Sequence, residues 1–233
     1  MLPPRYAIYF VPDRKTALYQ FGASVLGYDC YSGDELPLIS GVDANAWLET
    51  VQEPRVYGFH ATLKAPFRLA DGRSEVDLIQ AVQTFAGAHA PVHVGALSMR
   101  EIGSFIALVP DAACPPLDLL AEACVRDFDH FRAPMTATDR ERRLAAGLNA
   151  PQIAYLDQWG YPYVFEAFRF HMTLTGALAA RERASTFQFL CDRFMQIPEA
   201  HALTLDQIVV TRQDDKGSRL QVIEIAPLGR SLA

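Results

Sequence analysis

The chain has 233 residues, of which 50% are hydrophobic and 21% are charged, as in an ordinary globular protein of one large domain or two small lobes. Its formal net charge of −6 disfavours a groove for long RNA or DNA, because such grooves gain their affinity mainly by neutralising phosphates. No apolar run approaches the roughly 20 residues that cross a bilayer, and the first ten residues do not resemble a signal peptide. We therefore expect no membrane association.

Neither the cysteines nor the closely spaced histidines predict a metal site. The chain has four scattered cysteines, without the close pairs typical of zinc or redox sites: Cys30, Cys114, Cys124 and Cys191. His89 and His93 have the spacing of two ligands on a helix, but Pro91 would break that helix between them. We expect free, buried thiols in a cytoplasmic protein.

The first half of the chain predicts alternating strands and helices. The expected elements are a strand in RYAIYFVPD (5–13), a helix to about residue 26, an irregular stretch, a strand in GFHATLK (58–64), a helix over 75–88, and strands near 92–99 and 105–109. Asp13 can cap the first helix and Gly27 can end it. Ser74 and Asp77 form a start resembling a capping box for the second helix.

The second half repeats this order with an insertion. SFIALVPD (104–111) matches RYAIYFVPD, and RFHMTLT (169–175) matches GFHATLK. The other expected elements are a helix opened by Pro115 and Pro116 and running to about 131, a helix over about 180–195, and strands near 203–212 and 220–226. The insertion covers about 136–162 and predicts two short helices, one starting at Thr138 and one ended by Gly160.

This repeated order predicts an α+β fold. We expect a duplicated strand–helix–strand–strand unit that forms two antiparallel-sheet lobes around a central cleft. Residues 1–233 would form one bilobal domain, with approximate repeats at 1–103 and 104–233. The alternative is two unrelated stretches that look alike because strands share a composition, but the order, motifs and capping signals all favour duplication.

Each half contains a His-x-Thr strand. Residues two apart on a strand point to the same face, which predicts two polar faces: His60, Thr62 and Lys64 on one strand, and Arg169, His171 and Thr173 on the other. Each face combines an imidazole, a hydroxyl and a cation, and would suit an anionic ligand. Paired about a pseudo-twofold axis, the two repeats can bring their histidines together across a cleft.

Two histidines on either side of a phosphodiester would supply acid–base catalysis. An imidazole titrates near neutral pH, so one can take a proton from the attacking water or hydroxyl while the other gives one to the leaving alkoxide. The threonine hydroxyls can donate to the non-bridging phosphate oxygens, where charge develops. We therefore expect catalytic roles for His60, Thr62, His171 and Thr173, with no need for a metal or another cofactor.

The doubled motif resembles a known superfamily. With the wider stretches YGFHATLKAPF (57–67) and WGYPYVFEAFRFHMTLTG (159–176), it resembles the two-histidine (2H) phosphoesterases, which include RNA 2′-5′ ligase-like proteins and cyclic nucleotide phosphodiesterases. It is most similar to the branch found with bacterial phosphonate-degradation operons. The resemblance covers essentially the whole chain and implies two lobes facing a catalytic cleft. It also implies a substrate with a cyclic phosphate or 2′-5′ linkage, and for this branch a phosphorylated ribose intermediate.

Three functions compete. The leading hypothesis is a metal-independent phosphodiesterase that hydrolyses a small cyclic phosphate or ribose phosphoester, so that its partner is a small phosphorylated nucleotide or ribose. The first alternative is an RNA 2′-5′ ligase or RNA end-processing enzyme, which the acidic balance of the chain disfavours. The second is a non-catalytic protein that binds a nucleotide or phosphosugar.

Other residues near the motifs have two interpretations each. Lys64 and Arg169 are candidate substrate contacts, although a cation at a strand edge is often only solvated. Tyr57 can bind substrate by stacking on a base or sugar, or pack in the core. The run DRERR (139–143) is expected to be a solvated helix face, with an anion-binding rim as the alternative. The aromatic residues of the insertion are expected to pack it rather than cover the substrate: Trp159, Tyr161 and Tyr163.

Overall fold

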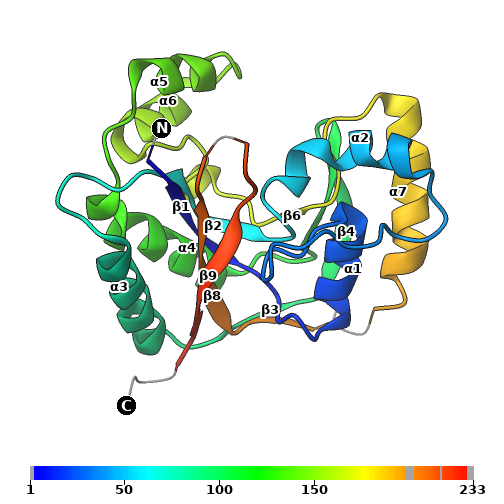
Figure 1. Cartoon of the computed structure of the whole chain (residues 1–233), viewed down its shortest axis with the longest axis horizontal. Helices are drawn as coiled ribbons and strands as arrows, with labels where there is room; N and C mark the ends of the chain where they lie inside the picture. The colour runs from blue at the N-terminus through cyan, green and yellow to red at the C-terminus, as the bar shows by residue number, and fades with distance from the viewer. Residues whose placement is uncertain (1–2, 198–201, 216, 230–233) are drawn as a thin grey trace.

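The protein, seen in a computed structural model that describes residues 3–197, 202–215 and 217–229, is built on a seven-stranded antiparallel sheet (Figure 1). The strand order is β4-β5-β6-β2-β1-β8-β9. These strands are β1 (Arg5–Phe10), β2 (Ala61–Phe67), β4 (Leu97–Ile102), β5 (Phe105–Pro110), β6 (Met172–Thr173), β8 (Gln207–Gln213) and β9 (Gln221–Pro227). A two-stranded antiparallel sheet pairs β3 (Val92–Gly95) with β7 (Leu203–Leu205). The predicted α+β class with antiparallel sheets is confirmed.

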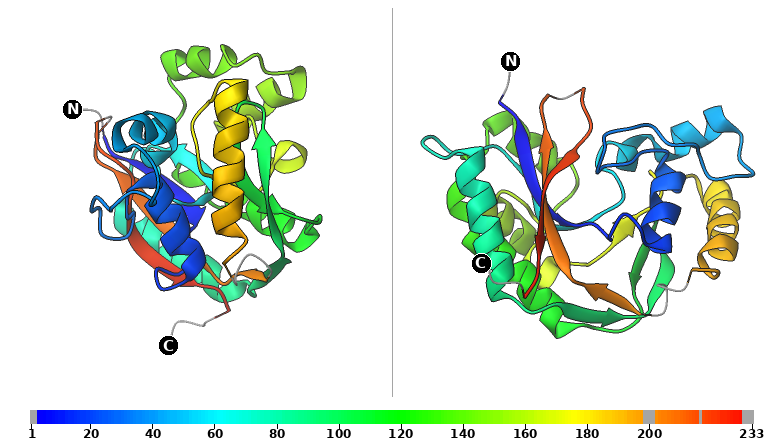
Figure 2. Two further views of the ribbon diagram at one scale, coloured as in Figure 1. Left: turned by 90° about the vertical axis from the view of Figure 1, so that its right-hand side faces the viewer. Right: turned by 60° about the horizontal axis from the view of Figure 1, so that its bottom comes forward.

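Helices cover the sheet in two groups. The helices are α1 (Ala17–Leu26), α2 (Ala44–Arg55), α3 (Glu75–Ala88), α4 (Pro115–Asp127), α5 (Ala137–Leu144), α6 (Ala150–Trp159) and α7 (Ala180–Phe194), with short 3₁₀ turns η1 (Asp129–Phe131) and η2 (Phe165–Ala167). Helix α3 contacts β8 and β9, and α4 contacts β2, whereas α7 contacts β4 and β5. Figures 1 and 2 show α3 and α4 on one side of the molecule and α1 and α7 on the other, with strands between them.

Both ends of the large sheet combine strands from the two halves of the sequence. Strand β4, from the first half, pairs with β5 from the second, and β8, from the second half, pairs with β1 from the first. The segments that lead into β4 and β8 are also paired with each other, as β3 and β7. The two His-x-Thr strands, β2 and β6, are neighbours near the centre of the sheet.

The two repeated units pair their strands in the same register. In each unit, the strand that ends in Val-Pro-Asp lies antiparallel to the His-x-Thr strand. The equivalent pairs are Tyr9–Thr62 and Phe10–Ala61 in the first unit, and Ala107–Thr173 and Leu108–Met172 in the second. This shared register confirms the duplicated unit.

Several predicted boundaries are wrong. The N-cap of α1 is Thr16 rather than Asp13, because the Thr16 hydroxyl accepts a backbone N–H of the first turn. Helix α5 is capped in the same way by Thr136, not Thr138. Helix α2, capped by Asp43, occupies a stretch expected to be irregular. Two expected strands are each divided, into β3 and β4 and into β7 and β8.

Other boundary signals are confirmed. Ser74 and Asp77 form the reciprocal capping box of α3. Gly27 and Gly160 end α1 and α6 in the left-handed conformation that glycine adopts without strain. The helix opened by Pro115 ends earlier than expected, at the end of α4, and continues as the separate turn η1.

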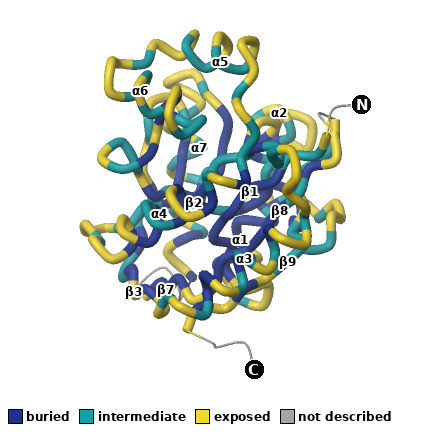
Figure 3. The backbone as a smooth tube through the Cα atoms, turned by 90° about the vertical axis from the view of Figure 1, so that its left-hand side faces the viewer, coloured by how far each residue is buried: buried dark blue, intermediate teal, exposed yellow. Residues whose placement is uncertain are grey.

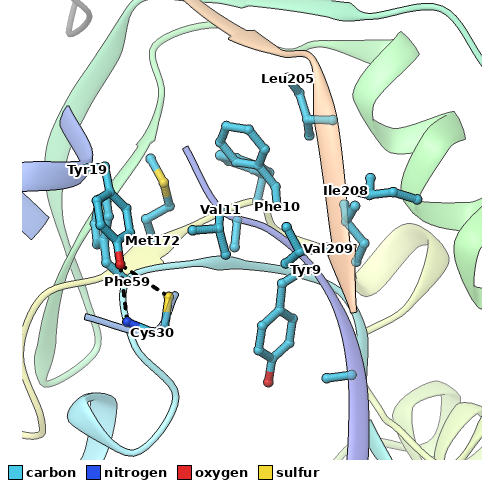
Figure 4. Packing of buried hydrophobic residues seen from close by; sticks show 14 of the residues in the cluster. Tyr9, Phe10, Val11, Tyr19, Cys30, Phe59, Met172, Leu205, Ile208 and Val209 are labelled. Carbon is cyan, nitrogen blue, oxygen red and sulfur yellow. Dashed lines mark hydrogen bonds between the residues drawn. The ribbon is translucent and has the colours of Figure 1, made fainter. Parts of the chain in front are cut away.

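Strand β1 is buried on both faces and forms part of the hydrophobic core. Phe10 lies 6.2 Å from Phe170 between ring centroids, within the hydrophobic core. Figure 4 shows the ring of Tyr9 extending to the opposite side of β1 from Phe10. Helices α5 and α6 stand at the margin of the molecule and are mostly exposed or half-buried (Figure 3).

Candidate functional site

The two His-x-Thr motifs face each other at the centre of the sheet. Ala61 pairs with Met172 across β2 and β6. In an antiparallel pair this register sets each histidine opposite the threonine of the other motif. All four predicted catalytic residues line one cavity of about 900 Å³: His60, Thr62, His171 and Thr173.

Both imidazoles are held in the same way. The Nδ1 of His60 lies 2.8 Å from the Gly58 carbonyl oxygen, and the Nδ1 of His171 lies 2.7 Å from the Arg169 carbonyl oxygen. A carbonyl can only accept, so each Nδ1 carries the proton and each neutral ring keeps its lone pair on Nε2. The Thr62 hydroxyl lies 3.2 Å from the Nε2 of His60. The backbone therefore prepares both rings to exchange protons through Nε2.

The position of His60 depends on a glycine. Gly58, whose carbonyl accepts the imidazole proton, has a φ of +74°, and a Cβ there would lie 2.5 Å from the Cβ of Cys30. Residues other than glycine pay a conformational cost at this φ, and this site adds a collision with the buried Cys30. Gly58 is thus required by both backbone geometry and packing.

We expect Gly58→Ala to lower the free energy of unfolding by about 2–4 kcal/mol, the sum of the left-handed backbone and overpacking costs. Gly72→Ala is the matched control, because Gly72 has a φ of +76° but a Cβ added there would meet nothing within 4 Å. Urea unfolding of both variants measures the difference. Equal stability of the two would show that the contact with Cys30 has no effect.

The two histidines sit in different surroundings. The ring of Tyr9 stacks on His60 with 3.9 Å between centroids and 28° between planes. At the equivalent position of the second unit stands Ala107, opposite Thr173. Removal of the His60 ring from water lowers its pKa to about 4, and the nearby His171 acts in the same direction. The two repeated units therefore differ at their histidines. His60 is neutral at pH 7 and lies under the ring of Tyr9, whereas the second unit has Ala107 in place of that ring.

Tyr9 is a site residue that the motif did not reveal. It lines the cavity, yet its side chain is only 1% exposed and its hydroxyl has no hydrogen-bond partner among the described residues. Burial also raises the pKa of Tyr9 well above its ordinary value. An alignment of the two Val-Pro-Asp strands could have identified Tyr9. It sets Tyr9 against Ala107, so that the two units differ in side-chain size next to their His-x-Thr motifs.

Lys64 does not share the face of His60 and Thr62. The β1–β2 register shifts between Tyr9–Thr62 and Ile8–Lys64, and this irregularity ends the strict alternation of side chains. Lys64 is 4% exposed, and its ammonium donates to the Val125 carbonyl at 2.9 Å and to Asp129 at 3.2 Å. Lys64, predicted to contact a phosphate, is thus held in a partly buried ion pair with Asp129 and does not line the cavity of the histidines.

The other two predicted substrate contacts have separate positions. Tyr57 lines the cavity of the histidines, with its ring 6.0 Å from that of His60. Arg169 is exposed and lines an adjoining cavity of about 1290 Å³, which shares His171 and Thr62 with the first. Its guanidinium donates to the Phe168 carbonyl at 2.9 Å. Arg169 therefore lies before β6 rather than on the strand, and lines the neighbouring cavity rather than that of the histidines.

The cavity is basic, although the chain is acidic. Besides the histidines, its charged lining among the described residues is one carboxylate, Asp139, and five arginines: Arg5, Arg68, Arg132, Arg142 and Arg143. Two of these arginines come from the predicted run 139–143 in α5. Arg143 is half-buried, so the expectation of a wholly solvated helix face does not hold for it. Sequence composition could not show this local excess of positive charge.

The aromatic residues of the insertion divide between packing and the cavity wall. Trp159 meets Phe165 edge to face at 5.2 Å, as expected for packing. Tyr161 and Tyr163 line both cavities and meet each other edge to face at 5.5 Å. The insertion therefore forms part of the wall around the two histidines.

Other expected features concern metals, thiols and membranes. Over residues 3–197, 202–215 and 217–229, no group of three or more His, Cys, Asp or Glu side chains could hold a metal ion. The four cysteines are free thiols; Cys30 and Cys124 are buried as expected, whereas Cys114 and Cys191 are half-buried. None of the helices in the described part of the chain is long and apolar enough to cross a bilayer.

Comparison with known proteins gives a family. A family model described as "Protein of unknown function (DUF1045)" matches residues 62–221. The chain is 36% identical over 219 residues to "Ribose 1,5-bisphosphate phosphokinase PhnN" of Janthinobacterium sp. (strain Marseille), covering 92% of this chain and 48% of that protein. It is also 36% identical over 174 residues to the protein of that name from Laribacter hongkongensis (strain HLHK9), covering 75% of this chain and 40% of that protein.

The chain spans about half the length, or less, of these curated relatives. A crystal structure of a phosphoesterase aligns with 97% of this chain and 99% of its own, at a TM-score of 0.42 and 11% identity. The family match covers more than half of the chain and includes Thr62 and the whole second motif. The chain therefore belongs to the DUF1045 family.

Proposed function

We propose that this protein is a metal-independent phosphodiesterase that hydrolyses a small cyclic phosphate or ribose phosphoester. The observation that carries the proposal is the pair of His-x-Thr motifs, each set opposite the other in one basic cavity. Each ring donates from Nδ1 to the backbone and keeps Nε2 for proton transfer. This arrangement suits general acid–base chemistry on an anionic ester.

We infer the roles of the two rings in hydrolysis from their different surroundings. His60, neutral at pH 7, takes a proton from water through Nε2 as the water oxygen attacks phosphorus. His171, in its protonated form, gives the Nε2 proton to the departing alkoxide. A new P–O bond forms, one ester P–O bond breaks, and a cyclic phosphate opens to a phosphate monoester with the net addition of one water. The hydroxyls of Thr62 and Thr173 donate to the non-bridging oxygens as charge develops.

Two observations support a sugar phosphate as the substrate: the names of the relatives and the resemblance of the doubled motif. The relatives are named for ribose 1,5-bisphosphate, a doubly phosphorylated ribose. The doubled motif resembles the two-histidine phosphoesterase branch associated with phosphonate degradation. We therefore place the substrate among phosphorylated riboses or nucleotides, with a role in phosphonate catabolism.

Turnover by the purified chain tests the proposal. We expect the protein to hydrolyse adenosine 2′,3′-cyclic phosphate at the same rate with and without EDTA. Chromatography of the monophosphate product measures this rate. Activity that EDTA abolishes and a divalent ion restores would contradict the metal-independent mechanism. Joining or trimming of RNA ends without action on the mononucleotide would favour the RNA enzyme. Binding without turnover would favour a phosphosugar-binding protein.

A further inference from the structure

The cavity that holds the two histidines contains more positive charge than one phosphodiester requires. A phosphodiester carries a single negative charge, and the imidazoles and threonine hydroxyls already face it. The five arginines gather in a protein whose formal net charge is −6. Like charges in one cavity repel each other, so their assembly suggests a second anionic group in the ligand.

Some of these arginines are already neutralised. Arg132 pairs with Asp129, with its Nε 2.8 Å from the carboxylate. Arg142 pairs with Asp139 at 2.9 Å and is largely exposed. Both therefore act mainly within the protein, and the remaining charge lies with three other arginines.

Arg143, Arg68 and Arg5 have unused binding capacity. Among the described residues Arg143 forms no ion pair, and its guanidinium lies 5.2 Å from the ring centroid of Tyr161. In the same part of the chain, the Nε of Arg68 is buried without a hydrogen-bond partner, and the only carboxylate that Arg68 contacts is Asp139 at 3.6 Å. Arg5 donates to the neutral side chain of Gln213. Incompletely satisfied guanidinium groups are expected where a ligand completes them.

A second, independent observation points to the same place. The Tyr9 hydroxyl is buried, has no hydrogen-bond partner in the described chain, and belongs to a residue of the cavity wall. The ring of Tyr9 stacks on His60 with 3.9 Å between centroids, and the ring of Tyr57 lies 6.0 Å from that of His60. Tyr161, which lies against Arg143, lines the same cavity as Tyr9 and Tyr57. The arginines and the histidines therefore share a cavity wall that contains these tyrosines.

We propose that Arg143, Arg68 and Arg5 form a second anion-binding subsite, which takes a terminal phosphate monoester on the same small molecule whose phosphodiester lies between His60 and His171. The placement of the phosphodiester between the histidines rests on the proposed function, whereas binding of the phosphate monoester by the arginines does not. A phosphate monoester carries about −1.5 to −2 charges and three acceptor oxygens, which match guanidinium donors. A cavity of about 900 Å³ has room for a phosphorylated nucleotide or sugar.

The kinetic test compares two probes that differ by one phosphate. Adenosine 2′,3′-cyclic phosphate is compared with the same compound bearing a 5′-phosphate. We expect the wild-type chain to show at least about tenfold higher kcat/KM for the 5′-phosphorylated probe, the effect of charge-assisted bonds to one phosphate. Arg143→Ala should lower kcat/KM much more for the 5′-phosphorylated probe than for the plain probe, and so remove most of this advantage.

The matched control is Arg140→Ala. Arg140 lies on the same helix but pairs with Asp157 of α6 and does not line the cavity. An exposed ion pair of this kind contributes little to stability, so this variant should keep the wild-type preference. Equal kcat/KM for the two probes in the wild type, or an equal loss on both probes in Arg143→Ala, would overturn the second subsite.

A binding measurement separates this inference from the proposed function. Calorimetric titration compares adenosine 3′,5′-bisphosphate with adenosine 3′-monophosphate at one ionic strength, and requires no turnover. We expect at least about tenfold tighter binding of the bisphosphate, lost in Arg143→Ala and kept in Arg140→Ala. Tighter binding of the bisphosphate without any hydrolysis of the cyclic phosphate would support the second subsite and contradict the proposed phosphodiesterase function. Hydrolysis together with equal binding of both compounds would support the phosphodiesterase function and contradict the second subsite.

Discussion

Replacing either His60 or His171 by alanine is expected to lower kcat for a cyclic phosphate by at least about 10²-fold, because each ring supplies a proton transfer worth roughly 10²–10⁴. Both rings line the same cavity, and both are oriented through Nδ1 by a carbonyl two residues earlier. The double variant should lose little more than the worse single variant, since the two transfers belong to one reaction.

The measurement is initial-rate kinetics on adenosine 2′,3′-cyclic phosphate, with thermal unfolding to establish that each variant is folded. His89→Ala serves as the matched control. His89 ends α3, where it stacks on Phe85, and it does not line the cavity. Near-normal turnover by a folded His60→Ala or His171→Ala variant would exclude paired acid–base roles.

Replacing Tyr9 by alanine is expected to move the acidic limb of the pH–rate profile upward. The profile of kcat/KM reports the free enzyme, whose His60 has a pKa lowered to about 4 by its removal from water. A base acts in its neutral form, so the rate should rise with pH through this pKa. Exposing His60 to water should raise its pKa toward the ordinary value of about 6.5. At pH 5 the variant should therefore lose about tenfold or more relative to its own rate at pH 7.5.

Tyr9→Phe separates the ring from its hydroxyl. It keeps the stacked ring that covers His60, so the acidic limb should stay near its wild-type position. It also removes a buried hydroxyl without a partner in the described structure, and should raise the free energy of unfolding by about 1 kcal/mol. NMR titration of the His60 ring measures its pKa directly. An unshifted His60 pKa in a folded Tyr9→Ala protein would show that the ring does not control it.

The local sequence pattern carried much of the fold. The alternation of polar and apolar residues identified the His-x-Thr strands, and the repeated Val-Pro-Asp strands predicted the duplication that the shared register confirms. Capping residues such as Ser74 and C-terminal glycines such as Gly27 marked helix ends correctly. These signals can be read locally because each depends on hydrogen bonds or backbone angles within a few residues, although the caps of α1 and α5 are Thr16 and Thr136 and not the predicted residues.

The errors at the site arose where distant contacts override a local pattern. Strict alternation would set Lys64 beside His60, but the shifted pairing with β1 sends it to Asp129. The arginines of the site show the same limit, since Arg5 and Arg143 are far apart in the chain and line one cavity. A single strand or helix contains no information about which distant residue it meets.

By itself, the sequence determined the chemistry available to this protein: two imidazole–hydroxyl pairs on strands, carried by a duplicated α+β unit. It also predicted that the two histidines meet, whereas only the tertiary structure decided which other groups join them. The β1 register covers His60 with Tyr9 but leaves Ala107 in the equivalent place of the second unit. The reason is physical, because side-chain identity and strand faces are local properties, whereas register, burial and the resulting pKa of His60 depend on nonlocal pairing.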